Sequence, residues 1–259
     1  LNTGFVGTTM LCPALTETGH HDVAVQLLLN EEYPGWLYSV NMGATTIWER
    51  WNSVMPDGHL NKDGMNSLNH YSYGAVLEWI FRHVAGIDVT EQGPGGKMMR
   101  ISPKVDHKLG SASAVYDSAS GCYRCGWQIE NGDQITVTIT VPFGAKAQVI
   151  LPYAPDSVYH DTDNPLFETV ENGICCVKAG QYTVTYKAAS PLKKSYSVDS
   201  TLEDLLAEPA IRAFLSNMME VDMIPDLAYG LTLRQAAEAF AGGVSAEQAQ
   251  RLNVLLEEF

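Results

Sequence analysis

The stretch Ile135-Thr136-Val137-Thr138-Ile139-Thr140-Val141 alternates apolar and polar residues, all of them β-branched. Successive side chains of a strand point to opposite faces, so this period of two predicts a strand with one buried face. Turn sequences at 131–133 and 171–173 lie between shorter segments of similar character. Those segments are 111–116, 122–129, 147–151, 150–152, 174–177 and 182–186. Several short strands at this spacing predict an antiparallel β-sandwich over residues 87–190.

Residues 1–86, which precede this sandwich, follow the helical period instead. Apolar residues three to four apart predict helices over 6–18, 21–30 and 67–84. The first ends at Gly19 and the last at Gly86, because glycine tolerates the left-handed conformation that closes many helices. The intervening residues 36–66 have little periodicity and predict a long loop. Its three tryptophans are typical of a functional rather than a disordered loop.

Residues 191–259 return to helix and predict a small bundle. Three capping boxes, in which a hydroxyl and a later carboxylate or amide satisfy each other's free backbone donors, mark the helix starts. They pair Ser200 with Glu203, Thr232 with Gln235 and Ser245 with Gln248. The expected helices are 201–219, 232–241 and 245–258. Eleven acidic and five basic residues give this tail a net charge of −6, and it carries no pattern that indicates chemistry.

The composition excludes several classes of partner. The net charge of −14 argues against a nucleic acid or an anionic membrane surface, which would repel the chain, and favours a neutral ligand. The longest apolar run, residues 23–29, is far shorter than the roughly 20 residues that cross a bilayer. The first residues lack a starting Met and a targeting signal, so we expect an interior cut there.

Five cysteines, an odd number, favour a reducing and therefore cytoplasmic compartment over a disulfide framework. Cys122 and Cys125 have the spacing of half a zinc site, but the adjacent Cys175 and Cys176 cannot easily supply the other half. We therefore expect neither a metal nor another cofactor.

The segment 33–73 is rich in the residue types that bind sugars. Aromatic rings stack on the apolar face of a sugar, while amide, imidazole, guanidinium and carboxylate groups bind its hydroxyls. The segment includes Tyr33, Trp36, Tyr38, Trp48, Trp51, Tyr71 and Tyr73 together with Asn41, Glu49, Arg50, Asn69 and His70. Hydrolysis of a glycosidic bond needs two carboxyl groups, and Glu49 is the candidate for one of them. On spacing alone, the tryptophans also fit core packing, Glu49 and Arg50 a solvated rim, and His70 a helix cap.

Four motifs follow one another in this part of the chain. They are Gly4-Phe5-Val6-Gly7-Thr8-Thr9, Tyr33-Pro34-Gly35-Trp36, Gly43-Ala44-Thr45-Thr46-Ile47-Trp48-Glu49-Arg50-Trp51 and Ser67-Leu68-Asn69-His70-Tyr71-Ser72-Tyr73-Gly74. In this order they resemble the closing segments of the bacterial α-L-rhamnosidases of the inverting (α/α)6-barrel type. The resemblance extends over residues 1–190 and leaves the helical tail outside.

The resemblance implies a domain order and a set of roles. Residues 1–86 would be the C-terminal portion of an (α/α)6 barrel, followed by the β-sandwich and then the tail. Glu49 would be the catalytic general base and His70 a contact to rhamnose. Trp36, Trp48 and Trp51 would line the pocket, and Arg50 and Asn69 are further expected sugar contacts.

The general acid of the family has no counterpart in this chain. An inverting mechanism needs the acid about 6.5–9.5 Å from the base, and the resemblance implies that the acid lies upstream with most of the barrel. We therefore expect this chain alone to be inactive, with the upstream part of the enzyme as its partner and a rhamnose-containing glycoside as substrate. Arg50 or the aqueous loop would keep Glu49 charged. Exposed inner helix faces would favour association, for example as a homo-oligomer.

Two other functions also fit the residues. One is a non-catalytic carbohydrate-binding or assembly module built on the sandwich and the acidic tail. The other is a related (α/α)6 glycosidase for a different sugar, because the pattern specifies the carboxylate better than the sugar.

Overall fold

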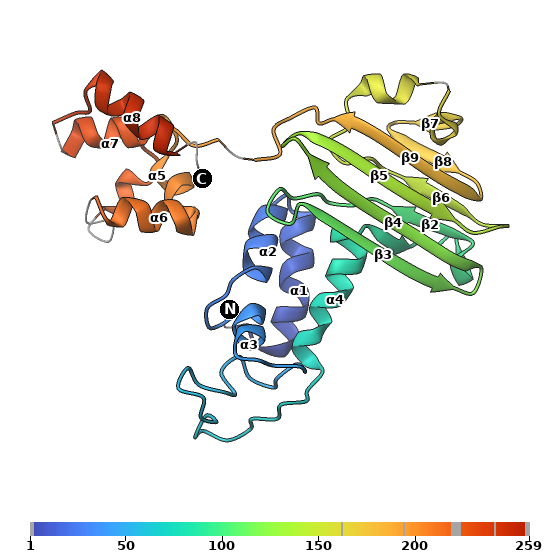
Figure 1. Ribbon diagram of the computed structural model, residues 1–259, viewed down its shortest axis with the longest axis horizontal. Coiled ribbons are helices and arrows are strands. Elements are labelled where there is room, and N and C mark those ends of the chain that lie inside the picture. The colour runs from blue at the N-terminus through green and yellow to red at the C-terminus, as the bar shows by residue number, and fades with distance from the viewer. Residues whose placement is uncertain (1–2, 162, 194, 219–223, 241, 257–259) are drawn as a thin grey trace. The chain divides into compact units, whose positions relative to one another are not determined.

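The computed structural model describes residues 3–161, 163–193, 195–218, 224–240 and 242–256 (Figure 1). They belong to two compact units, Leu1–Leu192 and Lys193–Phe259, each considered by itself below. None of the helices in the described ranges is long and apolar enough to cross a membrane. The predicted helix ends at 219, 241 and 258, and the expected cut at residue 1, lie outside the described residues.

The first unit begins with helices. They are α1 (Gly4–Glu17), α2 (His21–Leu28), α3 (Trp36–Asn41) and a composite helix made of a 3-10 turn (Ser72–Ala75), α4 (Val76–Trp79) and a π-helical end (Ile80–Val84). α1 packs beside α2 and α4, and the three run away from one side of the strands (Figure 1). The helices predicted over 6–18 and 21–30 are confirmed. The helix predicted over 67–84 begins only at Ser72, because the backbone before it pairs with residues 47–49. The predicted loop contains α3.

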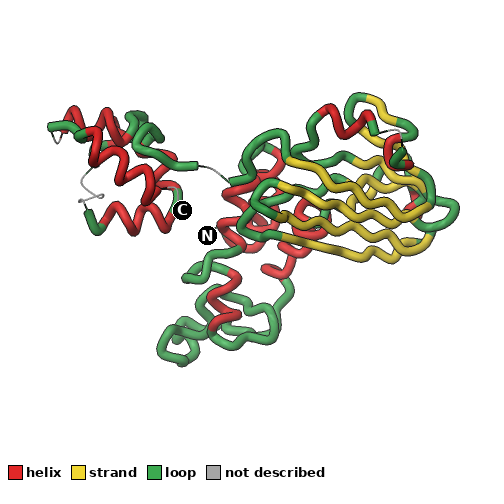
Figure 2. The backbone as a smooth tube through the Cα atoms, turned by 45° about the horizontal axis from the view of Figure 1, so that its top comes forward, coloured by secondary structure: helices red, strands yellow, loops and turns green. Residues whose placement is uncertain are grey.

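Two sheets follow the helices and are visible as two layers in Figure 2. The four-stranded sheet has the order β3 (Ser111–Ser118), β4 (Gly121–Glu130), β5 (Gln134–Val141) and β9 (Gly180–Lys187). The five-stranded sheet has the order β1 (Ile87–Val89), β2 (Met98–Ile101), β6 (Lys146–Val149), β8 (Ile174–Val177) and β7 (Val170–Glu171). Short 3-10 turns cover Pro94–Gly96, Asp156–His160 and Pro165–Phe167.

The prediction of an antiparallel sandwich is wrong at one pairing. β2 and β6 run parallel, with Met98 opposite Lys146 and Ile101 opposite Val149. Parallel neighbours need a long crossover, and the connection between them passes through β3, β4 and β5 of the other sheet. The strand predicted over 150–152 is also wrong, since β6 ends at Val149.

The core lies between the two sheets and continues into the helices. In β5 the four alternate residues Ile135, Val137, Ile139 and Val141 are at most 3% exposed, as the alternation predicts. They belong to one apolar cluster with Met99 of β2 and with residues of the helices. The helical section and the sandwich therefore share a single core.

Two buried aromatic side chains place polar atoms across this core. The hydroxyl of Tyr123 lies 2.8 Å from the carbonyl oxygen of Gly96 and 3.0 Å from that of Lys146, which ties β4 to the opposite sheet. The indole N–H of Trp127 donates to the carbonyl of Val84 at 2.8 Å. Because Val84 ends the composite helix, this bond anchors the helical section to the sandwich.

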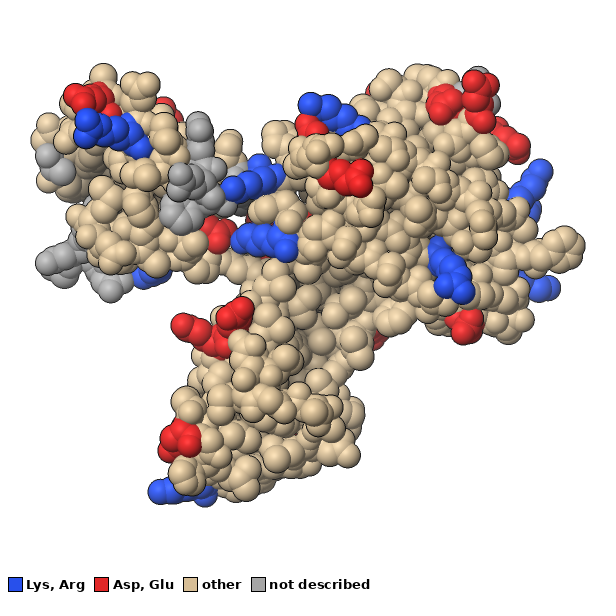
Figure 3. Space-filling view, in the orientation of Figure 1, with Lys and Arg blue, Asp and Glu red and all other residues tan. Residues whose placement is uncertain are grey.

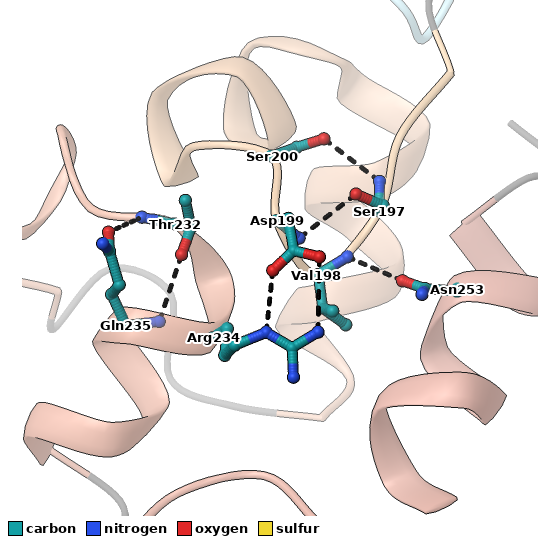
Figure 4. A network of polar contacts seen from close by, with 8 residues as sticks. All are labelled: Ser197, Val198, Asp199, Ser200, Thr232, Arg234, Gln235 and Asn253. Atoms are coloured by element: carbon teal, nitrogen blue, oxygen red, sulfur yellow. Dashed lines mark hydrogen bonds and ion pairs between the residues drawn. The ribbon is translucent and has the colours of Figure 1, made fainter. Parts of the chain in front are cut away.

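The second unit is a helical bundle. It contains α5 (Leu202–Ala207), α6 (Pro209–Ser216), a 3-10 turn (Asp226–Ala228), α7 (Leu233–Phe240) and α8 (Ala246–Leu256). The capping boxes of Thr232 with Gln235 and of Ser245 with Gln248 are confirmed by reciprocal hydrogen bonds of 2.9–3.2 Å (Figure 4). The single helix predicted over 201–219 is wrong, because the chain breaks before Pro209 and restarts as α6.

The first predicted cap is also wrong by one residue. Thr201, not Ser200, caps α5: its hydroxyl oxygen accepts the N–H of Asp204 at 3.1 Å. The hydroxyl of Ser200 instead accepts the N–H of Ser197 at 3.1 Å (Figure 4). The side chain therefore serves the turn before the helix rather than the helix.

The starts of α5 and α7 satisfy each other's backbone donors in a symmetric exchange. The N–H groups of Leu202 and Glu203 donate to the carbonyls of Leu231 and Tyr229 at 2.9 and 3.0 Å. In return, the N–H groups of Leu233 and Arg234 donate to the carbonyls of Ser200 and Val198 at 3.1 and 2.9 Å. Arg234 adds a two-pronged ion pair with Asp199 across the same junction (Figure 4).

Candidate active site

The loop that carries Glu49 is held against the segment that carries His70. The N–H of Glu49 donates to the carbonyl of Ser67 and the N–H of His70 to the carbonyl of Ile47, both at 2.8 Å. The hydroxyl of Thr46 adds a bond to the carbonyl of Leu68. Two segments nearly twenty residues apart thus lie antiparallel and bring the candidate base and the candidate sugar ligand to one place.

The carboxylate of Glu49 is partly exposed and has a backbone partner. Its Oε2 accepts the N–H of Ser67 at 3.1 Å. Ser67 therefore holds both the backbone and the side chain of Glu49. The sequence motif contained Ser67, but nothing in the pattern distinguished it from the other polar residues around it.

Arg50 follows Glu49 but makes its contacts elsewhere. Its Nη1 donates to the carbonyl of Gly64 at 3.1 Å, and its Nη2 lies 3.6 Å from a carboxylate oxygen of Asp63. The guanidinium thus fastens the later part of the loop. The expectation that Arg50 keeps Glu49 charged gains no contact in the structure.

The tryptophans of the loop pack on one another. Trp36 and Trp48 are only 7% and 6% exposed, and the indole N–H of Trp36 donates to the carbonyl of Tyr73 at 2.9 Å. The ring of Trp51 stacks on Tyr73 with centroids 3.8 Å apart and meets Trp36 edge-on at 5.1 Å. Trp36 and Trp48 belong to the packed interior of the loop, so little more than their ring edges can reach a ligand.

His70 is partly exposed, and one ring nitrogen is engaged. Its Nδ1 accepts the N–H of Ser72, at the start of the 3-10 turn, at 3.3 Å. Its ring stacks on Tyr71 and on Phe5, each with a centroid distance of 5.1 Å and interplanar angles of 14° and 25°. The capping interpretation of His70 is therefore correct for Nδ1, and it leaves Nε2 for another partner. The neighbouring Asn69 is exposed.

The other carboxylates of the loop are engaged. Asp63 pairs with Arg50, and Asp57 accepts the backbone N–H of His59 at 3.0 Å. That hydrogen bond is the main reason why the pKa of Asp57 is lowered. A general acid must hold its proton at working pH, so neither side chain suits that role.

The charge and the cysteines agree with a neutral ligand and no metal cluster. On the face shown in Figure 3, the helical and loop section carries few charged side chains. Within the described ranges, no three His, Cys, Asp or Glu side chains are grouped so that they could hold a metal ion. β4 directs Cys125 into the core and leaves Cys122 partly exposed, because residues three apart on a strand face opposite sides.

Two family models match the chain in succession. Residues 1–84 match the bacterial alpha-L-rhamnosidase 6 hairpin glycosidase domain, and residues 86–164 match the bacterial alpha-L-rhamnosidase C-terminal domain. The second unit lies outside both matches.

Similar proteins carry the same name. An alpha-L-rhamnosidase of Alteromonas sp. is 40% identical over 184 residues, which are 70% of this chain and 19% of the relative. One of Streptomyces avermitilis is 39% identical over 181 residues, 70% of this chain and 17% of the relative. The chain thus spans less than a fifth of the length of these relatives.

Solved structures agree with the sequence matches. The crystal structure of Streptomyces avermitilis alpha-L-rhamnosidase complexed with L-rhamnose superposes with a TM-score of 0.63 at 37% identity, covering 71% of this chain and 18% of that one. The alpha-L-rhamnosidase of Aspergillus terreus gives a TM-score of 0.59 at 29% identity, covering 73% and 20%. The resemblance seen in the motifs is confirmed by domain models, relatives and folds alike. The chain therefore belongs to the bacterial α-L-rhamnosidase family, as a C-terminal part of such a glycosidase.

Proposed function

We propose that the enzyme containing this chain releases terminal α-L-rhamnose from rhamnosides, with Glu49 as the general base. The observation that carries the proposal is the place of the Glu49 carboxylate. It is held by the N–H of Ser67 on a segment paired with the one that bears His70. This arrangement occurs in a chain whose relatives are named alpha-L-rhamnosidase.

The proposed reaction is an inverting hydrolysis. Glu49 takes a proton from a water molecule, which attacks the anomeric carbon while a second carboxyl group protonates the departing oxygen. Asp57 and Asp63 are engaged in the loop, so we assign the acid to the upstream part of the enzyme. In this proposal, α1 to α4 are helices of an (α/α)6 barrel completed by that part, and this chain alone is inactive.

Exposed apolar side chains of the helices support a barrel that continues beyond them. Val6, Met10 and Leu77 are 83%, 62% and 57% exposed, unusually open for such residues on helices. The remaining barrel helices would cover them. In their absence the same faces would promote association of the chain with itself.

The other site residues have supporting roles in the proposal. His70 offers Nε2 to a sugar hydroxyl, and the exposed Asn69 offers its amide. Trp36, Trp48 and Trp51 form the aromatic wall of the pocket, with Trp36 and Trp48 acting mainly through packing. Arg50 acts by shaping the loop through Asp63 and Gly64, unless the sugar displaces one of these contacts.

The test replaces Glu49 by Gln in the intact enzyme. General base catalysis contributes about 10²–10⁴-fold to rate, so kcat on an aryl α-L-rhamnoside should fall by roughly that factor. Asp63→Asn, a neighbouring carboxylate that the proposal leaves out of the chemistry, should retain most of kcat. Turnover of Glu49→Gln within a few fold of the wild type would refute the assignment. A first product that NMR shows to be the α anomer would refute inversion.

A further inference from the structure

Phe5 links the first helix to the candidate sugar site. Its ring, near the start of α1, stacks on His70 at 5.1 Å and 25°. It also meets Tyr73 edge-on at 5.3 Å and 66°, and Tyr73 in turn stacks on Trp51 at 3.8 Å. A continuous row of rings therefore runs from the buried wall of the loop through Phe5 to His70.

The hydrogen bond to Ser72 decides which nitrogen of His70 carries a proton. A backbone N–H can only donate, so Nδ1, which accepts it, is unprotonated. The neutral imidazole then carries its proton on Nε2. His70 can thus present an N–H to an acceptor oxygen such as a sugar hydroxyl.

That single hydrogen bond does not hold the plane of the imidazole. At 3.3 Å it is long for its type, and the χ2 angle of histidine is intrinsically broad. Two rings restrain the plane further, but Tyr71 is 85% exposed and is the covalent neighbour of His70. Phe5 is 39% exposed and comes from a different element, where Tyr73 supports it.

We propose that Phe5 is a positioning residue that holds the His70 ring so that its Nε2–H points at a hydroxyl oxygen of the bound sugar. The inference rests on the proposed function. A donor already oriented before binding loses little conformational freedom on binding, so the effect of Phe5 is on affinity for the sugar. It does not take part in the proton transfers of Glu49.

The test compares Phe5→Leu with Phe5→Tyr in the intact enzyme. Leucine keeps apolar volume without a ring, whereas tyrosine keeps the ring. We expect Phe5→Leu to raise KM for an aryl α-L-rhamnoside about tenfold with kcat within roughly threefold, because the lost restraint costs about one side chain's ordering. Phe5→Tyr should keep KM near the wild-type value. Phe143→Leu, at a 97% exposed site between β5 and β6, is the matched control and should change neither constant.

A double-mutant cycle shows whether Phe5 acts through His70. His70→Ala should raise KM, and adding Phe5→Leu to it should have little further effect. Full additivity would overturn the proposal, as would an unchanged KM for Phe5→Leu or an equal loss in Phe5→Tyr. Phe5→Met, a second replacement without a ring, gives the same readout if the leucine variant does not fold. Failure of the proposed function appears separately, as normal turnover of Glu49→Gln.

Discussion

Thr16 is the buried polar link between the helices, and replacing it with Val tests how much that link contributes. Thr16 is 6% and Trp79 is 1% exposed. The indole N–H of Trp79 donates to Oγ1 of Thr16 at 2.8 Å, and the same oxygen lies 3.1 Å from Nδ1 of His21. Valine has nearly the shape of threonine, so the substitution removes the oxygen and leaves the packing in place.

The expected cost follows from the groups left without a partner. A buried donor that loses its acceptor costs about 1–3 kcal/mol. The indole N–H of Trp79 is such a donor, whereas the partly exposed His21 can find water. We therefore expect Thr16→Val to lower the free energy of unfolding of the first unit by about 2 kcal/mol. Thr16→Ser keeps the hydroxyl and loses one buried methyl group, which costs about 0.8 kcal/mol.

Urea denaturation followed by circular dichroism and tryptophan fluorescence measures both variants. A change in the midpoint at constant m-value reports the change in stability. In a Trp79→Phe background, which lacks the indole N–H, the extra cost of Thr16→Val should largely vanish. A Thr16→Val variant no less stable than Thr16→Ser would refute the reasoning.

Two further predictions concern the same unit. Burial lowers the pKa of both His21 and His83 from the usual 6.5, so the unfolded chain binds more protons than the folded one just below that pH. Stability should therefore fall as the pH drops from 7 to 5, and the urea midpoints of His83→Gln should fall less steeply than those of the wild type. Gly86→Ala should abolish folding, as judged by thermal unfolding, because φ is +81° and a Cβ would lie 2.2 Å from the nitrogen of Pro103. Gly58→Ala, at φ +83° with open space around it, should cost only about 1 kcal/mol, and an equal loss in both would contradict the steric argument.

Local patterns predicted the elements whose own residues decide them. The alternation in 135–141 predicts β5 because one face of that strand is buried and the other is not. The capping boxes at Thr232 and Ser245 hold because each involves side chains only three residues apart. The box at Ser200 failed because Thr201 offered a competing hydroxyl one residue later.

The candidate site was predictable in its residue types but not in its contacts. The aromatic-rich motif around Glu49 placed the site in the correct family. Neither the hold of Ser67 on Glu49 nor the turn of Arg50 toward Asp63 follows from spacing. Both depend on which side of a loop meets which distant segment.

The sequence by itself determined the order of helix, strand and helix along this chain, the buried faces of its longer strands and the family to which it belongs. Those features arise from periodicity and from short motifs, which act over a few residues. Only the tertiary structure decided the parallel pairing of β2 with β6, the exchange of backbone donors between α5 and α7, and the stacking of Phe5 on His70. Each of these joins residues more than thirty positions apart, and their pairing is selected by the packing of the whole unit rather than by local preference.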